Sequence, residues 1–417
     1  MRLRTRGRAG RAIAAATVVG VIAAPLALTT GTAQAETAKV PPLKVMTRNL
    51  YLGVDIMRPL AAVDALPDDA PLLPDVVTAL ANATHEARTI VDETDFGTRS
   101  KLLAQEIAAA KPDLVGLQEV ALWRSGELQL AQAAIPNAET VDLNFLKMLR
   151  TELKAEGVPY RPVSVNWLSD VEAPSFGGTL AAPVQPRDVR LTMRDVILKR
   201  VGSGIKVLRH RERDYTAGLQ VEIAGQPLDF TRGYQWVDVQ RGQKRFRFIN
   251  THLEAFSSDM AFAQMKEMLE GPASKERTTI IACDCNSDPL NQSVKTGIDT
   301  LPHSEPYWLA TGEHEYFDTW LQWKPARFGW TSGLNETVDE PANADGWPVQ
   351  NAGTDNEKVS WTHRIDLILA RRADGGPLRV VRGEVTGDQV ADRMLDGEDT
   401  GLWPSDHAGV VISLRGL

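Results

Sequence analysis

Five segments of this sequence end in residues with carboxylate, amide or imidazole side chains. Most of these segments are apolar before that end. The five segments are residues 45–49, 117–119, 248–252, 280–286 and 405–407. Carboxylate and amide oxygens are ligands that Mg²⁺ accepts, and an imidazole beside a carboxylate can act as a general acid or base near neutral pH. Any one of these residues alone is more often a turn or capping residue. Only the whole set indicates a catalytic site.

Strands must carry these segments, because side chains at strand ends meet where loops converge on a rigid scaffold. The apolar pattern predicts strands over residues 43–48, 114–117, 189–199, 245–252, 278–285, 365–370 and 410–414. It predicts a helix over 98–110, and a second helix that Asp259 caps and Gly271 ends. Alternate residues of a strand share a face, which places Asp284 and Asn286 together. The alternation of strands and helices predicts an α/β fold of two packed mixed sheets flanked by helices.

Three long stretches lie between the predicted strands, at about 53–97, 121–187 and 288–360. Loops of such length inside a compact domain are usually functional, so we expect them to shape the substrate cleft. Seven of the ten tryptophans follow residue 300. Ordinary packing under long loops is the simpler expectation for them. The alternative is a cleft wall or an anchor at a lipid interface, with Trp320, Trp323 and Trp403 as candidates.

The N-terminus predicts export. Five arginines precede an apolar stretch over 12–28, and small residues at Ala33 and Ala35 predict cleavage of a signal peptide, residues 1–35, after Ala35. Loss of these five arginines lowers the formal charge from −8 to −13. We expect residues 36–417 to form a single catalytic domain with long loop insertions. Its acidic charge argues against a general nucleic-acid binder, although one local basic patch could still hold a nucleic-acid backbone.

Cys283 and Cys285 are the only cysteines. If both lie on one extended strand, their Cα atoms are near the upper limit for a disulfide, and a bridge over one residue would be strained. We therefore expect two small buried residues without a bridge.

The five segments together with Arg364–Leu369 resemble, in order and spacing, the signature of the endonuclease/exonuclease/phosphatase superfamily. Deoxyribonucleases, repair nucleases, inositol polyphosphate phosphatases and bacterial neutral sphingomyelinases belong to this superfamily. The resemblance spans residues 43–414 but is strong only in the motifs. It implies a four-layered α/β sandwich, a hydrolase of phosphoric esters and a secreted bacterial member similar to deoxyribonucleases and sphingomyelinases.

The resemblance also implies roles for individual residues. Glu119 would be the principal ligand of Mg²⁺ (or Mn²⁺ or Co²⁺), with Asn49 and Asp406 beside the metal. The expected catalytic residues are His252, Asp284, Asn286, Asp366 and His407. Asp284 would orient or deprotonate the attacking water, and Asp366 would fix the tautomer of His407. Substrate phosphate would contact Asn250, Asn286 and His252. A metal ion and protonated imidazoles would stabilise the charge that develops on phosphoryl oxygens.

Two departures from the family pattern matter. Cys283 replaces the glycine that often precedes the Asp-x-Asn pair. Tyr51 stands where repair nucleases carry an acid, and the run from Lys44 to Tyr51 matches secreted sphingomyelinases instead.

These features favour a phosphodiesterase of phospholipase C or sphingomyelinase type, which acts on a phosphodiester such as a membrane phospholipid. We expect a monomer, since no protein partner is implied. An extracellular nuclease is the alternative, and its basic groove would draw on Arg187, Arg190, Arg194, Lys199 and Arg200. A phosphomonoesterase is a third possibility. A catalytically inactive binding module is disfavoured because the motif residues are all retained.

Overall fold

The structure is a computed structural model, and it describes residues 41–67, 73–132, 135–223, 226–274, 276–339 and 361–417. Residues 42–417 form one compact unit. The expected signal peptide, residues 1–35, lies outside the described residues. None of the helices in the described ranges is both long and apolar enough to cross a bilayer.

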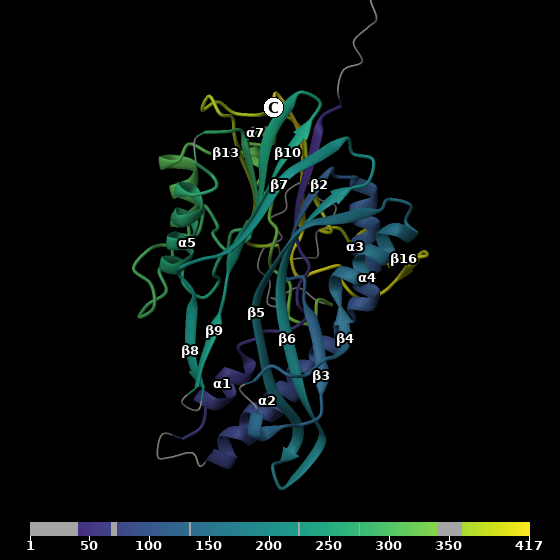
Figure 1. Cartoon of the computed structure of the whole chain (residues 1–417), viewed down its shortest axis with the longest axis vertical. Coiled ribbons are helices and arrows are strands. Elements are labelled where there is room, and N and C mark those ends of the chain that lie inside the picture. The colour runs from purple at the N-terminus through teal and green to yellow at the C-terminus, as the bar shows by residue number, and fades with distance from the viewer. Residues whose placement is uncertain (1–40, 68–72, 133–134, 224–225, 275, 340–360) are drawn as a thin grey trace, which may run out of the picture. The chain divides into compact units, whose positions relative to one another are not determined.

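The larger sheet contains eight strands (Figure 1). Its order is β15 (Arg379–Thr386), β18 (Gly409–Arg415), β1 (Leu43–Asn49), β2 (Leu114–Gln118), β6 (Ala182–Arg200), β3 (Leu122–Gly126) and β4 (Thr140–Asn144), and β5 (Tyr160–Thr179) also pairs with β6. Strands β1 and β2 are parallel, with Asn49 opposite Gln118. Their carboxyl ends therefore lie at the same edge of the sheet.

The second sheet has six strands. Its order is β13 (Phe317–Asp318), β14 (Asp366–Arg371), β12 (Thr279–Asp284), β11 (Lys244–His252), β10 (Gly233–Arg241) and β7 (Ile205–Asp214). The register sets His252 of β11 opposite Asp284 of β12, and Asp284 opposite Asp366 of β14. Three of the predicted catalytic residues thus form a row across neighbouring strands.

The helices of the described chain are α1 (Arg58–Asp64), α2 (Leu73–Glu93), α3 (Phe96–Ala110), α4 (Phe145–Ala155), α5 (Ser258–Glu270), α6 (Glu305–Trp308) and α7 (Thr319–Trp323). Helices α2, α3 and α4 pack against the larger sheet, and α5 packs against the smaller one. Short elements complete the described chain: the 3₁₀ turns Leu130–Gln132 and Val390–Arg393, the π turn Leu309–Glu313, and the hairpins β8 (Leu219–Ile223) with β9 (Gln226–Phe230) and β16 (Met394–Leu395) with β17 (Glu398–Asp399).

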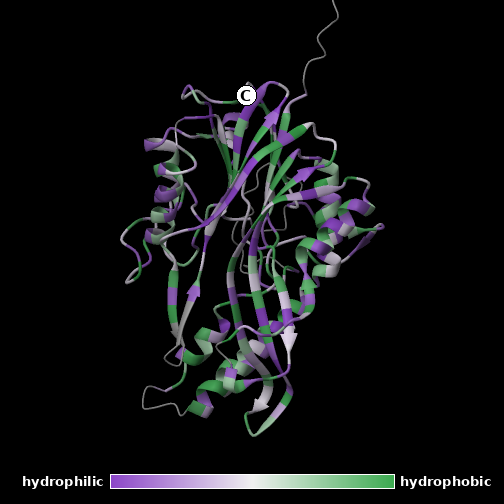
Figure 2. Ribbon diagram, in the orientation of Figure 1, coloured by the Kyte–Doolittle hydropathy of each residue, from purple (hydrophilic) through white to green (hydrophobic). Residues whose placement is uncertain are grey.

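Three apolar clusters separate the layers, and Figure 2 shows hydrophobic residues along the strands of both sheets. The central cluster joins the inner faces of the two sheets, for example through Val45 and Phe248. A second packs α3 and α4 on the larger sheet through Leu103 and Leu149. A third packs α5 on the smaller sheet through Met265. This helix–sheet–sheet–helix order confirms the predicted four-layered α/β sandwich.

All three stretches predicted as long loops contain regular structure. Residues 53–97 hold α1 and α2, residues 121–187 hold β3, β4, α4, β5 and the start of β6, and the described part of 288–360 holds α6, β13 and α7. Strands β5 and β6 are 20 and 19 residues long, and several bulges interrupt their pairing. These irregularities obscure a period-2 pattern in the sequence. The cap of α5 also differs from the prediction, because Ser257 accepts from the Met260 N–H, whereas Asp259 accepts from the backbone N–H groups of Thr300 and Leu301.

The two cysteines form a disulfide, so the prediction of unbridged residues was wrong. Strand β12 ends at Asp284, between the two cysteines. The cysteine Cα atoms are 5.1 Å apart, which is less than the roughly 6.4–6.8 Å that two residues span in an extended strand and well inside the range for a bridge.

Candidate active site

A pocket of about 290 Å³ opens where the ends of β1, β2, β11 and β12 meet the segment before β18. Its polar lining includes Glu119, Asp195, Arg232, His252, Asp284, Asn286, Asp406 and His407. Six of these eight residues are predicted site residues. Four of the five predicted segments line this pocket. The parallel pairs β1–β2 and β11–β12 explain much of this convergence, because they bring the carboxyl ends of their strands together.

Asp284 lies at the centre of the site. Its Oδ2 accepts from Asn49 Nδ2 at 2.9 Å and lies 3.4 Å from His252 Nε2. Its Oδ1 accepts from the Asn286 backbone N–H at 3.2 Å. Burial raises the pKa of Asp284 to about 7, with neighbouring carboxylates adding to the shift and His407 opposing it. A carboxyl group with such a pKa can accept a proton near neutral pH.

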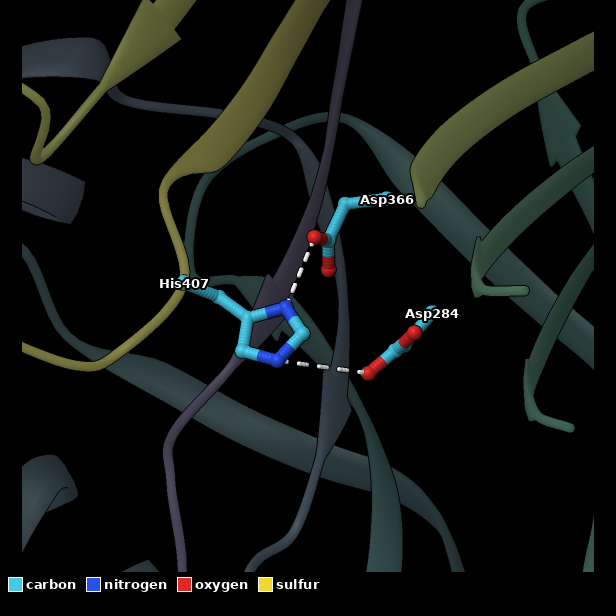
Figure 3. Close-up of side chains that lie close together, drawn as sticks. All are labelled: Asp284, Asp366 and His407. Carbon is cyan, nitrogen blue, oxygen red and sulfur yellow. Dashed lines mark hydrogen bonds and ion pairs between the residues drawn. The ribbon is translucent and has the colours of Figure 1, made fainter. Parts of the chain in front are cut away.

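His407 is held by Asp366 (Figure 3). Its Nδ1 lies 2.8 Å from Asp366 Oδ2, and its Nε2 faces Asp284 Oδ2 at 3.8 Å. Burial alone would lower the pKa of His407, but Asp366, Asp406 and Asp284 raise it well above its ordinary value. Since a carboxylate only accepts, Asp366 fixes the Nδ1–H tautomer and leaves Nε2 directed into the site.

The turn that carries His407 is tied to β1. Arg48, which is fully buried, donates to the His407 carbonyl oxygen and to Glu106. Ser405 Oγ donates to the Asn49 carbonyl oxygen at 2.9 Å. The position of the imidazole is therefore set by the larger sheet, while its tautomer is set by Asp366 of the smaller one.

His252 has the opposite tautomer. Its Nδ1 lies 2.9 Å from Arg232 Nη1, and a guanidinium group can only donate, so Nδ1 must accept and Nε2 must carry the proton. Burial lowers the pKa of His252 well below its ordinary value, and the charges of Arg232 and His407 add to this shift. The prediction of protonated imidazoles thus fits His407 but not His252, which acts as a neutral donor from Nε2.

Glu119 and Asp406 line the pocket on the side of the larger sheet. Glu119 has a φ of 54°, in the left-handed region, and its Oε2 accepts from the Leu52 N–H at 2.8 Å. A non-glycine residue held there directly after a strand marks a constrained position. Burial raises the pKa of Asp406 to about 6, His407 opposes the shift, and Glu119 adds to it.

Asp195 and Arg232 were not predicted as site residues. Asp195 lies on β6 and is buried, and its Oδ2 has no hydrogen-bond partner. Burial raises its pKa to about 8, an effect that Arg232 opposes and Glu119 strengthens. Asp195 carried one sequence signal, as a lone acid within an apolar predicted strand. Arg232 precedes β10 and reaches the site only through the packing of β10 on β11.

Three predicted site residues do not line the pocket: Asp366, which contacts His407, and Asn49 and Asn250. Asn49 does not line it; its amide holds Asp284 and accepts from the Tyr51 N–H at 2.8 Å. Asn250 is fully buried between the sheets, where Nδ2 donates to the Leu117 carbonyl oxygen and Oδ1 accepts from Gln118. Asn250 therefore does not reach the position expected of a substrate phosphate, whereas Asn286 lines the pocket and donates to the Leu253 carbonyl oxygen.

The donors around the pocket fit a divalent cation that prefers oxygen ligands. Asp284, Asp366 and His407 offer ligand atoms within 4.8 Å of one another, but the Asp366–His407 bond already pairs two of these groups. Glu119, Asp406 and Asp195 add three carboxylates, and their mutual repulsion contributes to the raised pKa values. Hard cations such as Mg²⁺ use carboxylates of this kind. Glu119 and Asp406 are therefore the residues that would hold the ion, next to Asp284.

The clustered carboxylates predict a pH-dependent stability that a cation should change. The pKa values of Asp406, Asp284 and Asp195 rise from 3.8 to about 6, 7 and 8. Their protonated forms stabilise the fold below about pH 4, and this stability is lost as the pH rises through the folded-state values. In EDTA the melting temperature should therefore fall between about pH 5 and pH 8, and Mg²⁺ should raise it more at the higher pH. If differential scanning calorimetry shows that Mg²⁺ raises the melting temperature equally at about pH 5 and pH 8, these carboxylates do not form a shared cation site.

The tryptophan candidates divide in two. Trp320 and Trp403 are buried, with exposed fractions of 7% and 0%, so they cannot anchor the protein at an interface. Trp403 packs edge-on against the buried Trp361. The third candidate, Trp323, is 37% exposed, and Trp308, which also follows residue 300, is 47% exposed, so these two side chains could contact an interface. Packing under the late loops, the simpler expectation, therefore holds for most of the described tryptophans after residue 300.

No protein-family model and no curated protein matches the sequence. Among solved structures, an endonuclease/exonuclease/phosphatase family protein from Leptotrichia buccalis C-1013-b aligns at 13% identity and a TM-score of 0.46, covering 90% of this chain and 100% of that one. An endonuclease/exonuclease/phosphatase from Beutenbergia cavernae DSM 12333 aligns at 20% identity and a TM-score of 0.44, covering 90% and 72%.

The catalytic domain of human Nocturnin, solved with a bound sulfate anion, aligns at 14% identity and a TM-score of 0.41, covering 90% of this chain and 93% of that one. A likeness at this level assigns no substrate to this chain.

Proposed function

We propose that this chain is a secreted, divalent-metal-dependent hydrolase of phosphoric esters, and specifically a phosphodiesterase of phospholipase C type. The observation that carries the proposal is the arrangement around Asp284. This carboxyl group contacts Asn49 and His252 and faces an imidazole that Asp366 orients. It shares a pocket with Glu119 and Asp406, the residues suited to hold Mg²⁺.

In the proposed reaction a water molecule attacks phosphorus in line with the leaving oxygen. Asp284, whose pKa is raised to about 7, accepts the proton of that water. One new P–O bond forms, the P–O bond to the alcohol breaks, and the alcohol takes its proton from solvent. The products are an alcohol and a phosphate monoester. The cation, when bound, neutralises charge on the phosphoryl group.

The chain's own donors complete the proposed site. The protonated His407 and the neutral His252 both direct Nε2 toward the region around Asp284. The Asn286 amide lies at the same wall. Fixed donors of this kind stabilise negative charge as it develops on the equatorial oxygens, because they need no reorientation during the reaction.

Three of the four arginines expected to form a nucleic-acid groove have partners within the chain. Arg194 is buried and donates to the carbonyl oxygens of Val120 and Ala121. Arg190 pairs with Asp170, and Arg200 pairs with Asp113. This stretch of β6 therefore supports the strand packing and offers little free charge for a nucleic-acid backbone.

A substrate panel tests the proposal. Purified protein should hydrolyse zwitterionic phospholipid vesicles faster than plasmid DNA at about 0.15 M salt, with a shallow dependence on salt. A nuclease would instead lose about 0.9 log units of affinity per log unit of salt for each phosphate contacted. Trp308→Ala or Trp323→Ala should lower the rate of hydrolysis on vesicles more than the rate on a soluble phosphodiester. The buried tryptophans are left unchanged in both variants. Efficient nicking of DNA with a steep salt dependence, and no lipid hydrolysis, would replace this assignment with the nuclease.

A further inference from the structure

A second cavity, of about 430 Å³, lies between helices α1 and α2 and the long β5–β6 hairpin. Below we call it the apolar cavity. Figure 2 shows hydrophobic residues on α1 and α2 beside this hairpin. Its lining includes Val76 and Leu80 of α2, Val171 and Ala173 of β5, and Val189 and Leu191 of β6. A cavity of this size is within the range that small ligands occupy in proteins.

The apolar cavity adjoins the candidate active site. Val54, Ile56, Ser169, Met193 and Phe230 line both spaces. Strand β6 shows the transition most clearly, because alternate residues of a strand share a face. On this face Val189, Leu191 and Met193 line the apolar cavity, and Met193 and Asp195 line the active-site pocket. Residues that follow one another on this face are about 7 Å apart along the strand. The face therefore changes from the hydrocarbon side chains of Val189 and Leu191 to the carboxylate of Asp195 within a short distance.

The polar groups of the apolar cavity are largely engaged within the chain. Asp170 accepts from Arg190 and Thr192, and Glu172 Oε2 accepts from the N–H groups of Asn137 and Ala138. Thr84 donates to the Leu80 carbonyl oxygen. At the other end, the lining residues Leu73 and Leu130 are 67% and 40% exposed. The cavity therefore suits an apolar occupant that enters from a nonpolar phase or from an aggregate.

We propose that the apolar cavity holds the hydrocarbon chain of an amphiphilic phosphodiester substrate whose phosphate lies against Asp284 and Asn286. This inference rests on the proposed function and names its substrate class. The shared lining residues place the two parts of such a substrate in adjoining spaces. Each methylene that enters the cavity leaves water, which favours binding by up to about fourfold per methylene.

The test uses soluble alkyl p-nitrophenyl phosphates with methyl, butyl and octyl groups, each below its critical micelle concentration and in Mg²⁺. The wild-type kcat/KM should rise about two- to fourfold per added methylene until the cavity is filled. Ala173→Phe should remove this rise by filling the space, and should leave hydrolysis of the methyl ester nearly unchanged. Leu80→Glu, at a half-buried position on α2, should do the same by placing a charge at the cavity wall.

Leu208→Glu is the matched control, because Leu208 is 37% exposed on β7 and lines neither space. It should keep the full dependence on chain length. Melting curves show which variants fold. One folded cavity variant, either Ala173→Phe or Leu80→Glu, is enough for the test. Hydrolysis of the methyl ester with no chain-length dependence in wild type, or a dependence that survives in a folded cavity variant, overturns the inference and leaves the proposed function standing. Failure to hydrolyse any ester contradicts the proposed function itself.

Discussion

Replacing Asp366 with asparagine is expected to lower kcat by about four orders of magnitude while leaving substrate binding nearly unchanged. Asp366 Oδ2 accepts the Nδ1–H of His407 at 2.8 Å. An asparagine carries no negative charge and can present its amide N–H to Nδ1, which would favour a neutral imidazole with an unprotonated Nδ1 and remove the positive charge that His407 directs at the substrate. The same substitution in the catalytic triad of serine proteases has an effect of this size. Steady-state kinetics on a soluble phosphodiester measures the loss.

A double mutant shows whether the two residues act as a unit. His407→Ala and Asp366→Asn together should cost little more than the more damaging single change, because each one already disables the same imidazole. Asp366 has no partner at its Oδ1 and is buried, so the fold should tolerate the isosteric change. If the free-energy losses of the two single variants add, the pair does not work as one group.

Much of the site could be predicted from sequence because strand ends hold it. His252 and Asp284 are the last residues of β11 and β12, Glu119 directly follows β2, and His407 lies two residues before β18, and each of these strands has a clear apolar pattern. Registers between neighbouring strands then set their spacing, as in the row His252–Asp284–Asp366. The four-layered architecture follows for the same reason, since the central strands are the most apolar segments of the chain.

The remaining site residues depend on contacts that local patterns do not encode. Asn250 shares a strand face with His252, yet it is buried between the sheets, where Gln118 and Leu117 satisfy its amide. Arg232 reaches His252 from a neighbouring strand. Asp195 faces the pocket because β6 pairs with β2, a pairing between strands far apart in the sequence. The cysteine bridge depends on the exact residue at which β12 ends, and strand boundaries are the weakest part of such predictions.

Removal of divalent metal is expected to abolish turnover, the second large effect. The carboxylates of Glu119 and Asp406 lie beside Asp284 with too few positive groups to balance them. Without a cation these carboxylates would repel a phosphoester anion. Glu119→Gln should weaken metal affinity more than it lowers the maximal rate, so excess Mg²⁺ should partly restore its activity. Leu208→Glu, far from the pocket, should show the wild-type metal dependence.

The most direct measurement is hydrolysis of a soluble phosphodiester by EDTA-treated protein, before and after titration with Mg²⁺, Mn²⁺ or Co²⁺. We expect no turnover in EDTA, saturable recovery with added metal, and a right-shifted recovery curve for Glu119→Gln. Full activity in excess EDTA, or no activity on any phosphoester at saturating metal, would contradict the assignment of this pocket as a metal-dependent phosphoesterase site.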